Sequence, residues 1–147
     1  MVDRFVTSPL ELPDDDAPFE RADLIFYGLD HGGASYEARV FLDAPDATHE
    51  TGRDHPAFAG SFYVFGHGGC FGDEGHCDVP AEHDPFDIRA PHQLEPALRI
   101  LTVTPSIAAL VKHGSKDVVV TVVAHATRGQ DNTVLAFDTV RLATYQG

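Results

Sequence analysis

The segment "DVVVTVVAHA", residues 117–126, constrains the fold most strongly, because it is an almost continuous run of β-branched and apolar residues. Such a run is typical of a central β-strand that is buried on both faces. Further short apolar or alternating segments, set apart by glycine, proline and acidic residues, also predict strands. They cover residues 23–29, 35–44, 58–66, 86–90, 97–104 and 132–145.

Helical patterning is confined to residues 105–114, where Pro105 stands near the start and Gly114 closes the segment. A parallel α/β fold needs crossover connections of about a dozen or more residues, and no other segment could supply even a short helix. We therefore predict an all-β fold, an antiparallel β-sandwich or jelly roll of about seven strands with one short helix.

A chain of 147 residues fits one domain. Residues 1–21 contain an Asp triplet and three prolines with little apolar periodicity, so we predict an extended N-terminal arm, followed by a β-sandwich domain over residues 22–147. There is no apolar run long enough for a signal-peptide core or a bilayer span. We expect a soluble cytoplasmic protein without a membrane partner, and export would need a carrier or an unseen precursor.

The chain is strongly acidic, with ten Lys and Arg against 23 Asp and Glu and a formal charge of −13. This charge repels the phosphate backbone, so we expect no nucleic-acid partner. The sequence also lacks a phosphate-binding glycine loop, a Gly-x-Ser-x-Gly elbow and paired His-x-x-x-His motifs. Nothing in these patterns requires an enzyme.

The strand predicted over residues 58–66 places aromatic side chains on both of its faces. Phe62 and Val64 share one face with Gly60, whereas Tyr63 and Phe65 point the other way. We therefore expect both faces to be covered. A glycine inside a strand also predicts a bulge or a close backbone approach.

A glycine-rich loop follows this strand, and it combines imidazoles with both cysteines of the chain: His67, Cys70, His76, Cys77 and His83. Imidazole and thiolate together favour copper(I) or zinc over magnesium or calcium. Two alternatives remain open. The cysteines could form a disulfide in an oxidising compartment, and each histidine alone is typical of an exposed loop residue.

The other histidines carry less weight. His125 lies in the central apolar strand, where we expect a hydrogen-bonded residue at the sheet end. The motifs "DHGG" and "GHGG" each join a histidine to flexible glycines, but neither has a nucleophile at a telling spacing. We expect five histidines to face solvent: His31, His49, His55, His92 and His113.

Several of these segments, taken together, show a family resemblance. They are "YEARVFLDAP", "FAGSFYVFGHG", the run from "ALRILTVT" to "VVVTVVAHA", and "NTVLAFDTVRLATY". This set resembles the C-terminal β-sandwich domain attached to type-3 copper proteins, namely plant polyphenol oxidases, some fungal tyrosinases and molluscan haemocyanin units. The resemblance implies a domain that sits over the dicopper centre of a helical oxidase domain and pushes one side chain into the substrate entrance. Phe65 matches the position of that plugging residue, and Tyr63 lies beside it.

The resemblance also bears on metal handling. In some fungal members a cysteine pair helps to load copper, and Cys70 and Cys77 look like a counterpart with wider spacing. The sequence has no counterpart of the helical domain with its six copper-binding histidines, so no oxidase activity is expected. The resemblance thus implies a stand-alone lid and copper-delivery partner of a separately encoded type-3 copper oxidase. The alternatives are a structural or binding module held by zinc or a disulfide, and an enzyme with its own metal centre.

Overall fold

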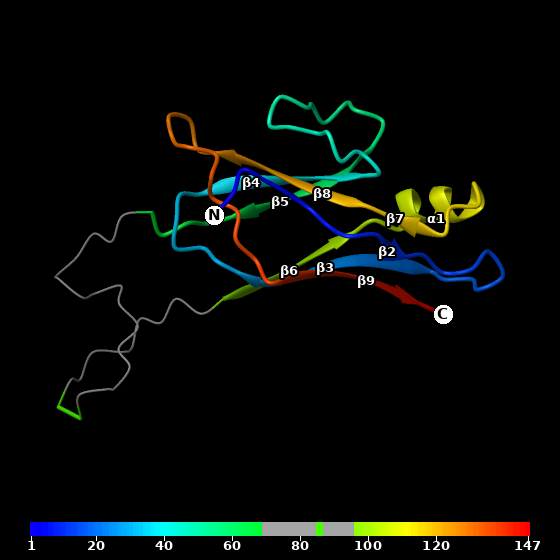
Figure 1. Cartoon of the computed structure of the whole chain (residues 1–147). Helices are drawn as coiled ribbons and strands as arrows, with labels where there is room; N and C mark the ends of the chain where they lie inside the picture. Colours follow the sequence, from blue (N-terminus) through cyan, green and yellow to red (C-terminus); the bar gives the residue numbers. More distant parts are fainter. Residues whose placement is uncertain (69–84, 87–95) are drawn as a thin grey trace.

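The computed structural model describes residues 1–68, 85–86 and 96–147, and it has an all-β architecture with one helix (Figure 1). The strand predicted at residues 86–90 falls almost wholly outside the described residues. The elements, in chain order, are β1 (Arg4–Val6), β2 (Leu10–Glu11), β3 (Arg21–Leu29), β4 (Tyr36–Leu42), β5 (Phe58–Val64), β6 (Ala97–Thr102), α1 (Thr104–Lys112), β7 (Asp117–Val118), β8 (Val120–Ala126) and β9 (Thr139–Tyr145).

The apolar segment that dominates the sequence forms β8, which lies inside a four-stranded antiparallel sheet of order β1-β8-β4-β5. Residues 120–124 of this strand are buried on both faces, as the sequence predicts. Inward-facing Val122 packs in the main core, whereas Val123 packs beneath the loop on the outer face. β-Branched side chains suit this position because they fill both sides of a pleated surface.

A three-stranded antiparallel sheet of order β6-β3-β9 packs against the first sheet, and β2 and β7 form a small separate ladder. The core between the two sheets includes Leu24 and Phe26 of β3, Val40 of β4 and Val122 of β8, all fully buried. Each such side chain contributes roughly 1.5–3 kcal/mol relative to an exposed one. The predicted all-β antiparallel sandwich is confirmed.

The segment predicted as an extended arm, residues 1–21, lies along the domain as far as the start of β3 at Arg21 and contributes two short strands. β1 pairs with β8, and β2 pairs with β7. The ring of Phe5 meets that of Phe137 edge to face, with centroids 4.6 Å apart. Backbone pairing and one aromatic contact thus attach this segment to the sandwich.

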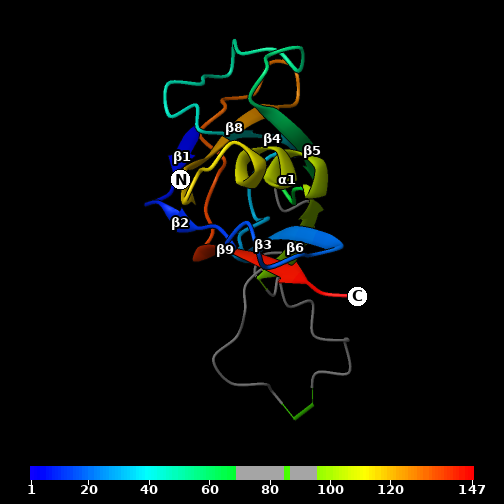
Figure 2. The same ribbon diagram turned by 90° about the vertical axis from the view of Figure 1, so that its right-hand side faces the viewer.

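Helix α1 follows β6 and covers one end of the sandwich (Figure 2), burying Ile107 and Val111. Pro105 stands in its first turn, where no backbone N–H is needed. Gly114, with a φ of +84°, follows its C-terminal end in the left-handed conformation that glycine adopts most readily. The predicted helix is confirmed. Within the described ranges, no helix is long and apolar enough to cross a membrane.

Gly60 marks an irregularity in the pairing of β4 with β5. Val40 pairs with Gly60, but the next residue, Phe41, pairs with Phe58, so the register shifts by one residue. Gly60 has a φ of +146°, and a Cβ atom there would lie 3.1 Å from Leu101. The predicted bulge is confirmed, and the close approach comes from the opposing sheet.

The loop of residues 43–57 covers part of the outer face of the four-stranded sheet (Figures 1 and 2). A small second core forms beneath it from Phe41, Ala44, Ala47 and Val123. The cover stops short of the end of β5 that leads to residue 65. This partial cover determines which outer-face side chains stay exposed.

Candidate functional site

The end of β5 presents two aromatic side chains to solvent. Phe62 and Val64 point into the core and are 8% and 1% exposed, whereas Tyr63 and Phe65 on the opposite face are 63% and 86% exposed. The expectation that both faces of this strand are covered is therefore wrong. The Arg53 guanidinium in the loop of residues 43–57 reaches Tyr63 Oη, but the loop leaves both aromatic rings exposed. The two rings thus form an exposed aromatic pair at this end of the outer face.

The backbone on either side of Phe65 is fixed. Val64 anchors the preceding position in the core. The Gly66 N–H donates to Ser35 Oγ at 3.0 Å, and the His67 N–H donates to the His31 carbonyl at 2.9 Å. Phe65 thus projects from a turn that is hydrogen-bonded to the β3–β4 connection.

Gly66 is required by this close approach of two backbones. A Cβ atom there would lie 2.2 Å from the Gly33 carbonyl oxygen and 2.4 Å from the Ala34 carbonyl carbon. Both contacts involve backbone atoms, which cannot swing aside as a side chain can. The glycine therefore sets how near the Phe65 turn lies to the β3–β4 connection.

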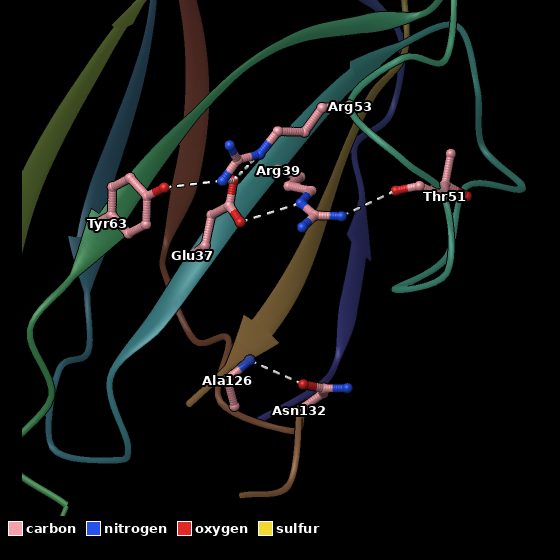
Figure 3. Close-up of polar contacts among 7 residues, drawn as sticks. All are labelled: Glu37, Arg39, Thr51, Arg53, Tyr63, Ala126 and Asn132. Atoms are coloured by element: carbon pink, nitrogen blue, oxygen red, sulfur yellow. Dashed lines mark hydrogen bonds and ion pairs between the residues drawn. The ribbon is translucent and has the colours of Figure 1, made fainter. Parts of the chain in front are cut away.

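A polar network on the outer face holds Tyr63 (Figure 3). The Arg53 guanidinium donates to Tyr63 Oη at 2.9 Å and to Glu37 Oε1 at 2.9 Å, and Arg39 Nε donates to Glu37 Oε2 at 3.2 Å. Glu37 lies directly opposite Tyr63 in the β4–β5 register. Burial alone raises the pKa of Glu37, but hydrogen bonds from Arg53 and Ser61, together with the nearby charge of Arg39, outweigh it and lower the pKa.

His125 borders the same surface, opposite Glu37 on the β8 side. It occupies the predicted sheet-end position, but its buried Nε2 atom has no hydrogen-bond partner within the described part of the chain. Burial, and then the positive charge of Arg39, lowers its pKa. A shallow cavity of about 260 Å³ lies between His125, Tyr63 and Phe65. The outer face beside Phe65 is thus an aromatic surface with the imidazole of His125 at its border.

Of the predicted metal ligands, the structure describes His67. His67 lies next to His31, with their Nδ1 atoms 3.2 Å apart, their ring centroids 5.0 Å apart and their ring planes at 63°. Cys70, Cys77, His76 and His83 lie outside the described residues. Among the residues that are described, no group of three or more His, Cys, Asp or Glu side chains could hold a metal ion.

Sequence reasoning assigned His31 to solvent and did not connect it with His67. The available signal was the pair of similar motifs, "DHGG" at residues 30–33 and "GHGG" at residues 66–69. The fold brings the two histidines together because the β3–β4 connection runs beside the exit of β5.

These features define an antiparallel two-sheet sandwich with a fixed, exposed aromatic residue at one strand end. No protein-family model matches the chain, and no curated protein matches it. Two solved structures do resemble it. One is a recombinantly expressed latent aurone synthase (polyphenol oxidase), with a TM-score of 0.57 and 14% identity over 98% of this chain. The other is latent aurone synthase (polyphenol oxidase) from natural source, with a TM-score of 0.55 and 13% identity over 97% of this chain.

The chain spans 24% of the length of each of these polyphenol oxidase chains. At such identities the likeness concerns the fold. It confirms the predicted resemblance to polyphenol oxidases at that level, and the matched portion is a minor part of each polyphenol oxidase chain.

Proposed function

We propose that this chain is a non-catalytic lid that acts in trans on a type-3 copper oxidase and places Phe65 in the oxidase's substrate entrance. The observation that carries the proposal is the 86% exposure of Phe65 on a backbone fixed from both sides. The fold shared with part of a latent polyphenol oxidase supports the choice of partner. Tyr63 lies beside the plug and borders the contact.

The energetics favour such a contact. Transferring a fully exposed phenylalanine into an apolar pocket contributes roughly 1.5–3 kcal/mol. Because Phe65 is already fixed by its neighbours, little further backbone entropy is lost on docking. Removing the ring should therefore weaken inhibition roughly 10- to 150-fold, at about 1.4 kcal/mol for each factor of ten.

The proposal extends to copper delivery. Cys70 and Cys77 as thiolates would bind copper(I), and His67, His76 and His83 would pass the ion on by ligand exchange to the partner's histidines. Support comes from the residue types, which match the preferences of copper(I), and from the acidic composition, which attracts cations. Zinc is the alternative metal.

The test of the lid is an inhibition assay. A type-3 copper oxidase from the same genome, lacking a lid of its own, is titrated with this chain while oxidation of a diphenol is followed. Wild type should inhibit, and Phe65→Ala should require roughly 10- to 150-fold more protein. Leu98→Ala is the matched control, because Leu98 is an apolar residue, 48% exposed, on the other sheet.

The outcomes separate the alternatives. If Phe65→Ala inhibits as well as wild type, the plug assignment fails. If wild type does not inhibit at all, the lid proposal fails, and a structural module stabilised by zinc or a disulfide is the better account. In that case a chelator or a reductant should lower the melting temperature.

A further inference from the structure

The contact between His31 and His67 joins the two sheets of the sandwich at one end. His31 follows β3 of the three-stranded sheet, and His67 follows β5 of the four-stranded sheet. The His67 N–H donates to the His31 carbonyl at 2.9 Å, and the neighbouring Gly66 N–H donates to Ser35 Oγ. The two imidazoles are therefore placed by the fold and do not depend on the conformation of long side chains.

The separation of the two Nδ1 atoms, 3.2 Å, is informative about ligand chemistry. Two imidazole nitrogens on one tetrahedral ion, each about 2.0–2.1 Å from the metal, lie about 3.3–3.4 Å apart. A linear two-coordinate ion would need about 4.0–4.2 Å at the same bond length. The observed spacing also fits an N–H···N hydrogen bond, in which one ring donates to the other. The His67 Nδ1 atom also lies 3.4 Å from the His31 carbonyl oxygen. The two Nδ1 atoms are thus close enough to share one ion.

The pair lies at the edge of the described part of the sandwich. His67 is exposed and His31 is half-buried. His31 also borders a cavity of about 540 Å³, which Asp30 and Asp138 line as well. The two carboxylates in this cavity favour a cation beside His31.

We propose that His31 and His67 together bind one copper(I) or zinc ion through their Nδ1 atoms. This inference deepens the copper-delivery part of the proposed function and rests on it. A pair of neutral imidazole ligands at the surface suits transfer, because an incoming ligand can bind before both imidazoles have left the ion. His31 is thus a metal ligand that the glycine-rich loop does not contain.

The test is a metal titration of five proteins: wild type, His31→Asn, His67→Asn, His49→Asn and Cys70→Ser/Cys77→Ser. Copper(I) is kept reduced with ascorbate and competed against bicinchoninate, and zinc is titrated separately by calorimetry. His49 is the matched control because it also lies in a surface loop but is not part of the pair. Circular dichroism of each variant confirms that the fold is retained.

We expect His31→Asn and His67→Asn each to weaken binding of one ion at least about tenfold, since changing a residue behind the ligands alone costs 10- to 100-fold. His49→Asn should bind as wild type does. Long-range proton–nitrogen NMR of the metal-bound protein should show both rings protonated at Nε2 and metal-bound at Nδ1.

Three results would overturn the inference. In the first, binding is lost in Cys70→Ser/Cys77→Ser but unchanged in His31→Asn. His31 is then no ligand, while copper delivery by the loop stands. In the second, neither copper(I) nor zinc binds wild type, and the copper-delivery part fails as well. In the third, NMR shows one Nδ1 protonated at saturating metal, and the contact is a hydrogen bond alone. The Phe65 inhibition assay reports on the lid independently of all three.

Discussion

Replacing Gly66 with alanine tests whether the Phe65 turn is held by the close approach of two backbones. The added Cβ atom would lie 2.2 Å from the Gly33 carbonyl oxygen, so the two segments must separate by about 1 Å to reach an ordinary contact. Overpacking of this kind costs roughly 1–3 kcal/mol. The shift would also weaken the hydrogen bond from Gly66 to Ser35, which contributes about 0.5–1.5 kcal/mol.

The assay is thermal and urea unfolding followed by circular dichroism, with Gly33→Ala as the matched control. Among the described residues, a Cβ atom at Gly33 meets only the Met1 side chain, at 3.7 Å, and the residue has no positive φ. We expect Gly66→Ala to lower the free energy of unfolding by about 2–4 kcal/mol, from the overpacking and hydrogen-bond terms together. For a chain of this size that is a fall in melting temperature of roughly 4–16 °C. Gly33→Ala should stay within about 1 kcal/mol of wild type. Equal stability of the two variants would refute the reasoning.

Three further predictions concern the buried polar groups and the core. Glu37→Gln should lower the free energy of unfolding in urea by about 1–2 kcal/mol. This is less than the roughly 3–5 kcal/mol that breaking a fully buried ion pair costs, because Arg53 is half exposed. An unchanged urea midpoint would contradict this. The pKa of Asp23, which accepts hydrogen bonds from Arg21 and Thr102, and the pKa of Glu37 are both lower in the folded protein than their ordinary values of 3.8 and 4.5. Both carboxylates therefore stabilise the fold at a pH above these ordinary values, and this stabilisation is lost as the pH falls through the lower pKa values of the folded protein. The free energy of unfolding, measured between pH 7 and pH 3, should therefore fall steeply below about pH 4.5 in wild type and less steeply in Asp23→Asn. Equal pH dependence in the two proteins would contradict this. Ile107→Ala should cost about 2–5 kcal/mol because this helix side chain is fully buried, whereas a cost below 1 kcal/mol would show that α1 is not part of the core.

The sequence predicts the elements of this fold wherever the apolar pattern is long. β8 and β4 follow from β-branched runs and strict alternation, and α1 follows from Pro105 and Gly114 at its ends. β1 and β2 do not follow, because they are two or three residues long and owe their conformation to pairing with strands more than a hundred residues away. Short strands carry too few residues to show a period.

The candidate site, like the fold, could be predicted from the sequence only in part. The alternation in β5 correctly separates Phe62 and Val64 from Tyr63 and Phe65, but it cannot show which face is covered. That depends on how far the loop of residues 43–57 extends over the sheet. The meeting of His31 with His67 is likewise a tertiary contact across 36 residues, and the two similar motifs that contain these histidines do not by themselves show that the fold brings them together.

The central claim is that Phe65 enters a pocket of a type-3 copper oxidase. The most direct measurement places 4-fluorophenylalanine at position 65 and records the change of its fluorine NMR shift between H₂O and D₂O, with and without the oxidase. The free protein should show a large solvent effect, because this side chain is 86% exposed. The account predicts that the effect largely disappears when the oxidase is added. A complex in which the fluorine signal keeps its full solvent effect would contradict the claim.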